Sequence, residues 1–247
     1  MPNNQGKQIV FEAIRPVLVD ARGTSKSYMA IYSVMKEFSH RNPESMIELL
    51  IHNSKGILHD ISTWCEATGN ELINSEVGSD AGDEDMHVLI QKGVQAGSDQ
   101  EGERQKEKKM IVMISSSDLD FVTAPFDRAL AGKVLGMEVS VIFEGAGVKL
   151  LQNGYRATRS GLFGAFRTSG VECNLRDSGS PIPSEAIAML AEMDAKFYVC
   201  GLSMEAHGVR QEELLVEHSV VASTVTWVEM LAHSDVNVFS RAKLETA

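Results

Sequence analysis

A polar stretch in the middle of the chain separates two segments that are patterned independently of each other. Residues 94–107 contain almost no apolar side chain after Ala96 and combine Gly, Ser and Gln with charged residues. A segment of this composition cannot bury a core, so we predict a flexible linker there. At roughly 150 residues per domain, the chain of 247 residues holds one large or two small domains. We therefore predict domains at residues 1–93 and 108–247.

Composition and charge exclude several classes of protein. Lys and Arg number 23 against 34 Asp and Glu, which gives a net charge of −11, and neither half is basic. We therefore expect no nucleic-acid partner, because nucleic-acid binding needs a patch that neutralises phosphates. No apolar run approaches the roughly 18 residues of a membrane-spanning helix, and the first residues lack the apolar core of a signal peptide. These features predict a cytoplasmic protein with no membrane partner.

The first half alternates between strand and helix patterns. Short apolar runs predict four strands, at residues 9–19 (interrupted by Pro16), 46–51, 71–75 and 86–90. Apolar residues at helical spacing predict two helices, at residues 26–38 and about 57–69. The resulting order, βαβαββ, is typical of a two-layer α/β sandwich.

The second half continues the alternation with strands of a different kind. Five apolar runs have strand character: residues 110–114, 138–143, 196–199, 220–221 and 236–239. The first is apolar throughout, which is typical of a parallel strand that is buried on both faces. Helical patterns separate most of these runs, and residues 152–183 resemble a loose loop region. Alternation of this kind predicts a parallel, doubly wound sheet with right-handed crossovers.

Cys200 is the leading candidate for a reactive residue. It follows the predicted strand at 196–199 and directly precedes a predicted helix start near Ser203. Reactive groups gather at the carboxyl ends of parallel strands, and the positive end of a helix favours the nucleophilic thiolate. His207 is a candidate proton donor or stabilising imidazolium. The residues alone leave open a buried structural role for Cys200 and a plain surface role for His207.

The remaining cysteines and a cationic run complete the candidate groups. The spacing of Cys65, Cys173 and Cys200 forms neither a disulfide framework nor a metal-binding CxxC pair, so each is interpreted as a free thiol. We expect Cys65 in the core and Cys173 in an exposed loop. The cationic run extends from Lys149 to Arg176 and contains one acidic residue, Glu172. Within it, Arg156, Arg159 and Arg167 lie among glycines and could hold an anionic ligand or remain a solvated loop. No zincin, P-loop or hydrolase-elbow motif occurs in the sequence.

Two stretches of the second half carry a family resemblance: residues 131–148, AGKVLGMEVSVIFEGAGV, and residues 196–209, KFYVCGLSMEAHGV. Through them, residues 110–240 resemble the DsrE/DsrF-like sulfur-relay family. Members of that family carry a cysteine after the third strand that accepts a persulfide sulfur, and Cys200 falls on that position. Because the members commonly assemble through this domain, the resemblance also implies a homo-oligomer.

The first half resembles a different sulfur-handling fold. The stretch VDARG at residues 19–23 and the stretch WCEATGNEL at residues 64–72 are similar to the TusA/SirA-like sulfur carriers. Those carriers have a Cys-Pro-x-Pro signature at the start of the first helix. The corresponding residues here are Lys26, Ser27, Tyr28 and Met29, without a cysteine or a proline. Lysine cannot hold sulfane sulfur, so this half is not expected to carry a persulfide.

Together these features predict an intracellular sulfur-relay protein that carries persulfide sulfur on Cys200. The expected partners are donor or acceptor proteins with reactive thiols and further copies of the chain. The chemistry requires no metal or nucleotide, so we expect no cofactor. Two alternatives stay open: a non-catalytic scaffold in which Cys200 is structural, and a small anion-binding domain that uses the arginine-rich loop.

Overall fold

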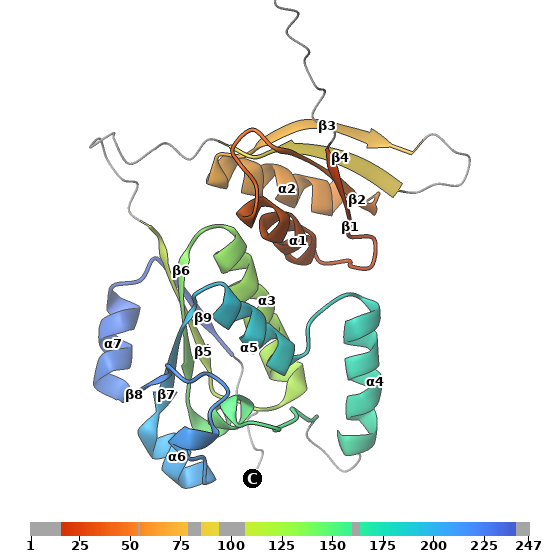
Figure 1. The fold of residues 1–247 in the computed structure, drawn as a ribbon. Coiled ribbons are helices and arrows are strands. Elements are labelled where there is room, and N and C mark those ends of the chain that lie inside the picture. The colour runs from red at the N-terminus through yellow and green to blue at the C-terminus, as the bar shows by residue number, and fades with distance from the viewer. Residues whose placement is uncertain (1–15, 54, 79–84, 94–106, 160–163, 241–247) are drawn as a thin grey trace, which may run out of the picture.

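The computed structural model describes residues 16–53, 55–78, 85–93, 107–159 and 164–240. Almost all of the predicted linker, and residues 9–15 of the first predicted strand, lie outside these ranges. The segments on either side of the linker form separate sheets, one of four strands and one of five (Figure 1). The division of the chain into two patterned segments therefore corresponds to two sheets.

The N-terminal segment is a two-layer α/β unit with a mixed sheet. Its elements are β1 (Val17–Asp20), α1 (Ser27–Ser39), β2 (Met46–His52), α2 (Lys55–Thr68), β3 (Glu71–Val77) and β4 (Asp85–Gln91). The strand order is β1-β2-β4-β3, with β1 parallel to β2 and the other pairs antiparallel. In β2, Ile47, Leu49 and Ile51 enter the main core at alternate positions, as expected for a strand that packs on helices through one face. The predicted order βαβαββ is confirmed.

The C-terminal segment is built on a parallel sheet of five strands. Its strands are β5 (Lys109–Ile114), β6 (Glu138–Phe143), β7 (Lys196–Cys200), β8 (Val220–Ala222) and β9 (Val236–Phe239). Its helices are α3 (Leu119–Val134), α4 (Gly164–Asp177), α5 (Pro183–Glu192), α6 (Gly201–His207) and α7 (Thr224–Ala232), with two 3₁₀ helices, η1 (Gly145–Leu151) and η2 (Gln211–Glu213). The order is β8-β7-β6-β5-β9, and every adjacent pair is parallel.

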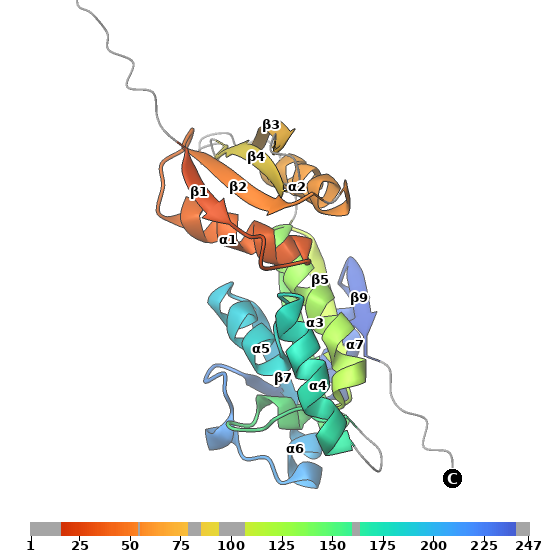
Figure 2. The same cartoon turned by 90° about the vertical axis from the view of Figure 1, so that its right-hand side faces the viewer.

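Both faces of this parallel sheet are covered. Helices α3 and α5 lie on one face and α7 lies on the other (Figures 1 and 2). Successive residues of β5 therefore enter different clusters: Val112 and Ile114 belong to the main core, whereas Met113 packs with Trp227 of α7. This two-sided burial explains the continuous apolar run of β5, and the predicted doubly wound parallel sheet is confirmed.

The loose region predicted at residues 152–183 is wrong, because it contains helix α4. The described side chains that α4 buries include two polar ones, Thr168 and Glu172, one helical turn apart. A helix that packs through polar residues shows no apolar stripe, so hydrophobic periodicity could not indicate it. This correction places Glu172 and Arg176 on the same helix.

The two sheets are joined through helix α1, which packs against the C-terminal domain (Figure 2). The Lys26 ammonium lies 2.9 Å from Asp127 Oδ2 on α3, and the Tyr28 hydroxyl donates to Asp127 Oδ1 at 2.6 Å. At the far side of the same surface, Tyr32 donates to Glu192 of α5. The two domains are therefore held together by polar contacts of helix α1 with α3 and α5.

Candidate functional site

Cys200 lies at the carboxyl edge of the parallel sheet. It is the last residue of β7, where it pairs with Ala222 of the edge strand β8, and it is also the N-cap of α6. Its side chain is half-buried and packs against the cluster that contains Ile142 and Trp227. Apolar side chains therefore pack against Cys200, and the residue as a whole is neither fully buried nor fully exposed.

Polar groups connect the loops around this edge of the sheet. The Ser115 hydroxyl, after β5, donates to Glu144 Oε1, after β6, at 2.9 Å. The Ser115 N–H donates to the Ser240 hydroxyl, after β9, at 2.8 Å. The Gly145 N–H donates to the Ser203 hydroxyl on α6 at 2.9 Å. Three loops and helix α6 thus form one hydrogen-bonded rim, and Ser203 anchors the helix that begins after Cys200.

Glycines allow η1 to approach the end of β5 within this rim. A Cβ atom on Gly147 would lie 2.2 Å from the carbonyl oxygen of Ile114, closer than any side chain permits. Gly145 has a φ of +49°, in the left-handed region that favours glycine. The Gly145-Ala146-Gly147 turn is therefore explained by backbone packing.

The structure does not bring His207 to Cys200. His207 is the last residue of α6, whereas Cys200 precedes its first residue. At a rise of about 1.5 Å per residue, the helix separates the two by roughly 10 Å along its axis. Direct proton transfer needs heavy atoms about 3 Å apart, so no such transfer links these two side chains in this conformation.

The other two thiols occupy contrasting environments. Cys65 is buried in α2, and this burial, followed by the nearby Glu66 carboxylate, raises the pKa of the Cys65 thiol to about 11. Cys173 is exposed on α4, and its sulfur lies 3.6 Å from Asp177 Oδ2. The expected positions of Cys65 in the core and Cys173 at the surface are confirmed, although Cys173 lies on a helix and not in a loop.

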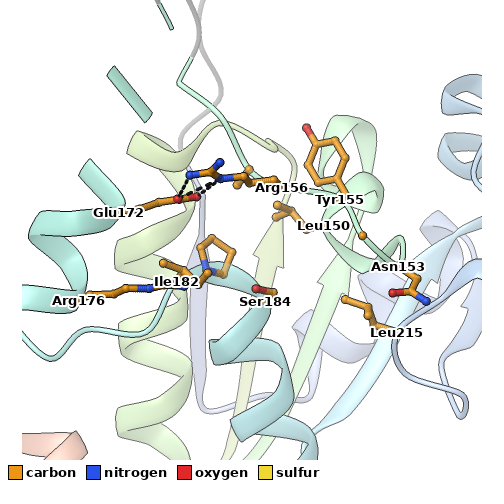
Figure 3. Close-up of a pocket in the computed structure, with 12 residues that line it drawn as sticks. Leu150, Asn153, Tyr155, Arg156, Glu172, Arg176, Ile182, Ser184 and Leu215 are labelled. Atoms are coloured by element: carbon orange, nitrogen blue, oxygen red, sulfur yellow. Dashed lines mark hydrogen bonds and ion pairs between the residues drawn. The ribbon is translucent and has the colours of Figure 1, made fainter. Parts of the chain in front are cut away.

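The predicted cationic run is divided into separate ion pairs. Arg156 forms a forked ion pair with Glu172, and Arg159 donates from Nε to Asp120 at 2.7 Å. The side chain of Arg167 lies outside the described residues. Arg176, the last residue of the cationic run, lines a cavity together with Arg156 and Glu172 (Figure 3).

An exposed apolar patch lies beside Cys200 and was missed by the sequence analysis. Its members are large apolar side chains on α6, β8 and α7: Leu202, Val220, Val221, Val225 and Val228. Leu202 is 74% exposed and Val225 is 80% exposed. We call this surface the edge patch, because β8 is the outermost strand of the sheet. Apolar surfaces of this kind usually mark interaction sites.

Known proteins resemble the C-terminal domain. The family model described as "DsrE/DsrF-like family" matches residues 108–239. The crystal structure of the ychN protein from E. coli is similar at 10% sequence identity with a TM-score of 0.40, covering 54% of this chain and 98% of that chain. No curated protein matches the chain. Within the described residues, no helix is long and apolar enough to cross a membrane. Because the family model covers more than half of its length, the chain belongs to the DsrE/DsrF-like family.

Proposed function

We propose that this protein carries sulfur as a persulfide on Cys200 and passes it to an acceptor thiol. Membership of the DsrE/DsrF-like family implies a role in sulfur relay. The observation that supports Cys200 as the carrier is its place at the carboxyl edge of the parallel sheet, half-exposed at the N-cap of α6. Neither Cys65, which is buried, nor Cys173, on an outer helix, has such a position.

The proposed transfer is an exchange between thiols and consumes no external oxidant or reductant. The Cys200 thiolate attacks the outer sulfur of a donor persulfide, R–S–SH. A new S–S bond forms to Cys200 while the S–S bond of the donor breaks, and the donor leaves as the thiolate R–S⁻. The proton stays on the transferred sulfur, so Cys200 becomes Cys–S–SH. An acceptor thiolate then attacks that outer sulfur, takes it as its own persulfide and restores the Cys200 thiolate.

The surroundings of Cys200 suit this chemistry. The hydrogen-bonded rim of Ser115, Glu144, Ser203 and Ser240 fixes the loops around the thiol. A rigid rim keeps the sulfur accessible without a large rearrangement, which favours attack by a second protein's thiol. The separation along α6 leaves His207 without a direct part in the exchange, so the proposal depends on Cys200 alone.

The edge patch supports partner binding next to the reactive thiol. We propose that it docks further copies of the chain, so that the C-terminal domains assemble into a homo-oligomer. Exposed β8 adds unpaired backbone groups to this surface, and edge strands of this kind readily pair with another chain. Donor and acceptor proteins then reach Cys200 from the rim side of the assembly.

We further propose that the N-terminal domain is a TusA/SirA-like domain that has lost its carrier function. The positions that correspond to the carrier signature begin at Lys26, and Lys26 and Tyr28 are engaged by Asp127. A sulfur carrier must present the start of this helix to its partner proteins. Here the start of α1 is bound to Asp127 of the same chain. The domain therefore serves as a fixed part of the relay protein.

The proposal is tested by single-turnover sulfur transfer from a persulfide donor to a thiol acceptor. The full chain should accelerate transfer, and Cys200→Ser should abolish the acceleration. Cys65→Ser and Cys173→Ser are matched controls that change one sulfur to oxygen elsewhere, and both should retain full activity. Equal acceleration by Cys200→Ser would contradict Cys200 as the carrier. No acceleration by the unmodified chain would contradict the proposal and leave the scaffold alternative.

A further inference from the structure

A cavity of about 500 Å³ lies between α4, the start of α5 and the loop that follows η1 (Figure 3). This volume is within the range of roughly 300–1,000 Å³ typical of sites for small organic ligands. None of the residues that line it belongs to the rim around Cys200. The cavity is therefore separate from the proposed site of sulfur transfer.

The wall of this cavity carries more positive than negative charge. Arg156, Arg176 and Glu172 are the charged residues that line it. Glu172 is largely buried, and the Arg156 guanidinium holds the pKa of the Glu172 carboxyl below its usual range. The carboxylate is thus ionised at neutral pH and neutralises one arginine. The second arginine, Arg176, pairs with Glu185, which does not line the cavity.

Glu172 holds the Arg156 guanidinium in place and leaves some of its hydrogen-bond donors unused by the described residues. Its Nε lies 2.8 and 3.0 Å from the two oxygens of Glu172, and its Nη2 also donates to this carboxylate. A guanidinium has five N–H donors, so this pairing leaves the Nη1 donors unused by the described residues. A fixed guanidinium with free donors is suited to bind an oxyanion through two parallel hydrogen bonds.

Arg176 supplies a second cation that can change partners. Glu172 and Arg176 project from α4 toward the side where Arg156 and Ile182 lie (Figure 3). The Nη2 of Arg176 lies 3.3 Å from Glu185 Oε1, and both side chains are largely exposed. Exposed ion pairs of this kind contribute only about 0–1 kcal/mol, so a ligand oxyanion could displace Glu185 at little cost.

Apolar side chains form the rest of the cavity. Leu150, Ile182, Pro183 and Leu215 line it. Leu150 and Pro183 are buried, so Ile182 and Leu215 supply the apolar surface that solvent reaches. Inorganic anions would leave this surface in contact with water. A ligand with an apolar body would cover it and gain the corresponding hydrophobic free energy.

We propose that this cavity binds a small organic anion, with a carboxylate or phosphate group between Arg156 and Arg176 and an apolar body on Ile182 and Leu215. Among the three arginines that the sequence indicated, only Arg156 takes part in the described site. Arg159 is already paired with Asp120 and does not line the cavity. Arg176 takes the role of the second cation.

Isothermal titration calorimetry of the full chain with four probes tests this proposal. Benzoate and phenyl phosphate combine an oxyanion with an apolar ring, benzamide keeps the ring without the charge, and inorganic phosphate keeps the charge without the ring. The site predicts that one or both organic anions bind more tightly than inorganic phosphate and that benzamide does not bind. Whichever organic anion binds more tightly identifies the preferred head group. Equal binding of benzamide, or no binding of either organic anion at millimolar concentration, would overturn the proposal.

Variants locate the binding in this cavity. Arg176→Gln should weaken binding of the preferred organic anion about tenfold or more, as expected for the loss of one charged hydrogen bond. Arg128→Gln, an equal charge change at an exposed position of α3 that does not line the cavity, is the matched control and should bind as the unmodified chain does. Cys200→Ser should also bind normally, which separates this site from sulfur transfer. Equal affinities of Arg176→Gln and Arg128→Gln would place the anion elsewhere and contradict the proposal.

Discussion

The hydroxyl group of Tyr28 lies 2.6 Å from Oδ1 of Asp127 and joins the start of helix α1 to helix α3 of the other domain. Tyr28 is buried, and this burial, followed by the bond to Asp127, raises the pKa of the phenol. The phenol is therefore protonated at neutral pH and donates to the carboxylate. Lys26 binds the second oxygen of the same carboxylate. Asp127 thus accepts from two residues of the N-terminal domain.

Removal of the Tyr28 hydroxyl should weaken the interface between the domains. Tyr28→Phe leaves Asp127 Oδ1 without its donor, and we expect a loss of about 1.5–3 kcal/mol in the free energy of unfolding, the usual value for a hydrogen bond to a charged group. Tyr32→Phe removes the same atom from a more exposed bond to Glu192 and should cost less than about 1 kcal/mol. Urea denaturation of both variants measures the difference. A smaller loss for Tyr28→Phe than for Tyr32→Phe would contradict the assigned interface.

The environment of Cys65 predicts selective alkylation of the thiols. With its pKa raised to about 11 by burial, Cys65 has a thiolate fraction of only about one in a thousand at pH 8. Iodoacetamide should therefore label Cys200 and Cys173 in the folded protein and leave Cys65 unmodified. In concentrated guanidinium chloride all three should react, because unfolding removes the burial. Peptide mapping by mass spectrometry gives the result, and rapid labelling of Cys65 in the folded protein would contradict its assigned environment.

The pair of Glu172 and Arg156 predicts a pH-dependent contribution to stability. The pKa of Glu172 is lower in the folded protein than its usual value, so the pair stabilises the fold above the unfolded pKa of about 4.3. This contribution is lost as the pH falls through the lowered folded pKa. We expect Glu172→Gln to cost about 1–2 kcal/mol at neutral pH, allowing for solvent screening at the exposed arginine, and less near pH 3.

Denaturant titrations of Glu172→Gln and the unmodified chain across this pH range test that expectation. The difference between them should shrink steadily on acidification. A difference that stays constant with pH would mean that the variant acts through packing and not through the charge of Glu172.

The edge patch predicts which substitutions disrupt self-association. Val225→Glu on α7 places a charge on a side chain that is 80% exposed, so the fold of a single chain should tolerate it. If the patch joins copies of the chain, this variant should have a lower molecular mass in solution than the unmodified protein. Leu18→Glu, at an exposed position of β1 in the other domain, is the matched control and should leave the mass unchanged. Sedimentation equilibrium measures both, and an unchanged mass for Val225→Glu would contradict assembly through this patch.

The sequence predicted the strands of both domains because their burial follows simple patterns. The alternation in β2 and the continuous apolar run of β5 each reflect which faces of a strand are covered. Helix α4 could not be predicted in the same way, since Thr168 and Glu172 are polar and its glycines are typical of loops. Buried polar residues are stabilised by partners elsewhere in the chain, and sequence periodicity does not reveal those partners.

Of the candidate site, the sequence could predict only the position of Cys200, because that position follows from its own strand. The position of Cys200 after an apolar strand indicated the carboxyl edge of the sheet, and the structure has it there. Other features bring together groups from distant elements. Tyr28 contacts Asp127, and Arg156 and Arg176 line the same cavity. Such contacts depend on how the helices pack, which local spacing does not specify. The same limitation applies to His207, which is close in sequence but at the opposite end of α6.

The intact mass of the full chain after incubation with a persulfide donor is the most direct measure of its sulfur-carrying role. The account predicts a gain of one sulfur atom, located on Cys200 by peptide mapping and removed again by a reducing thiol. The Cys200→Ser chain should keep its original mass, and Cys173→Ser should gain the sulfur normally. A gain of sulfur by Cys200→Ser, or no gain by the unmodified chain, would contradict the assignment of Cys200 as the carrier.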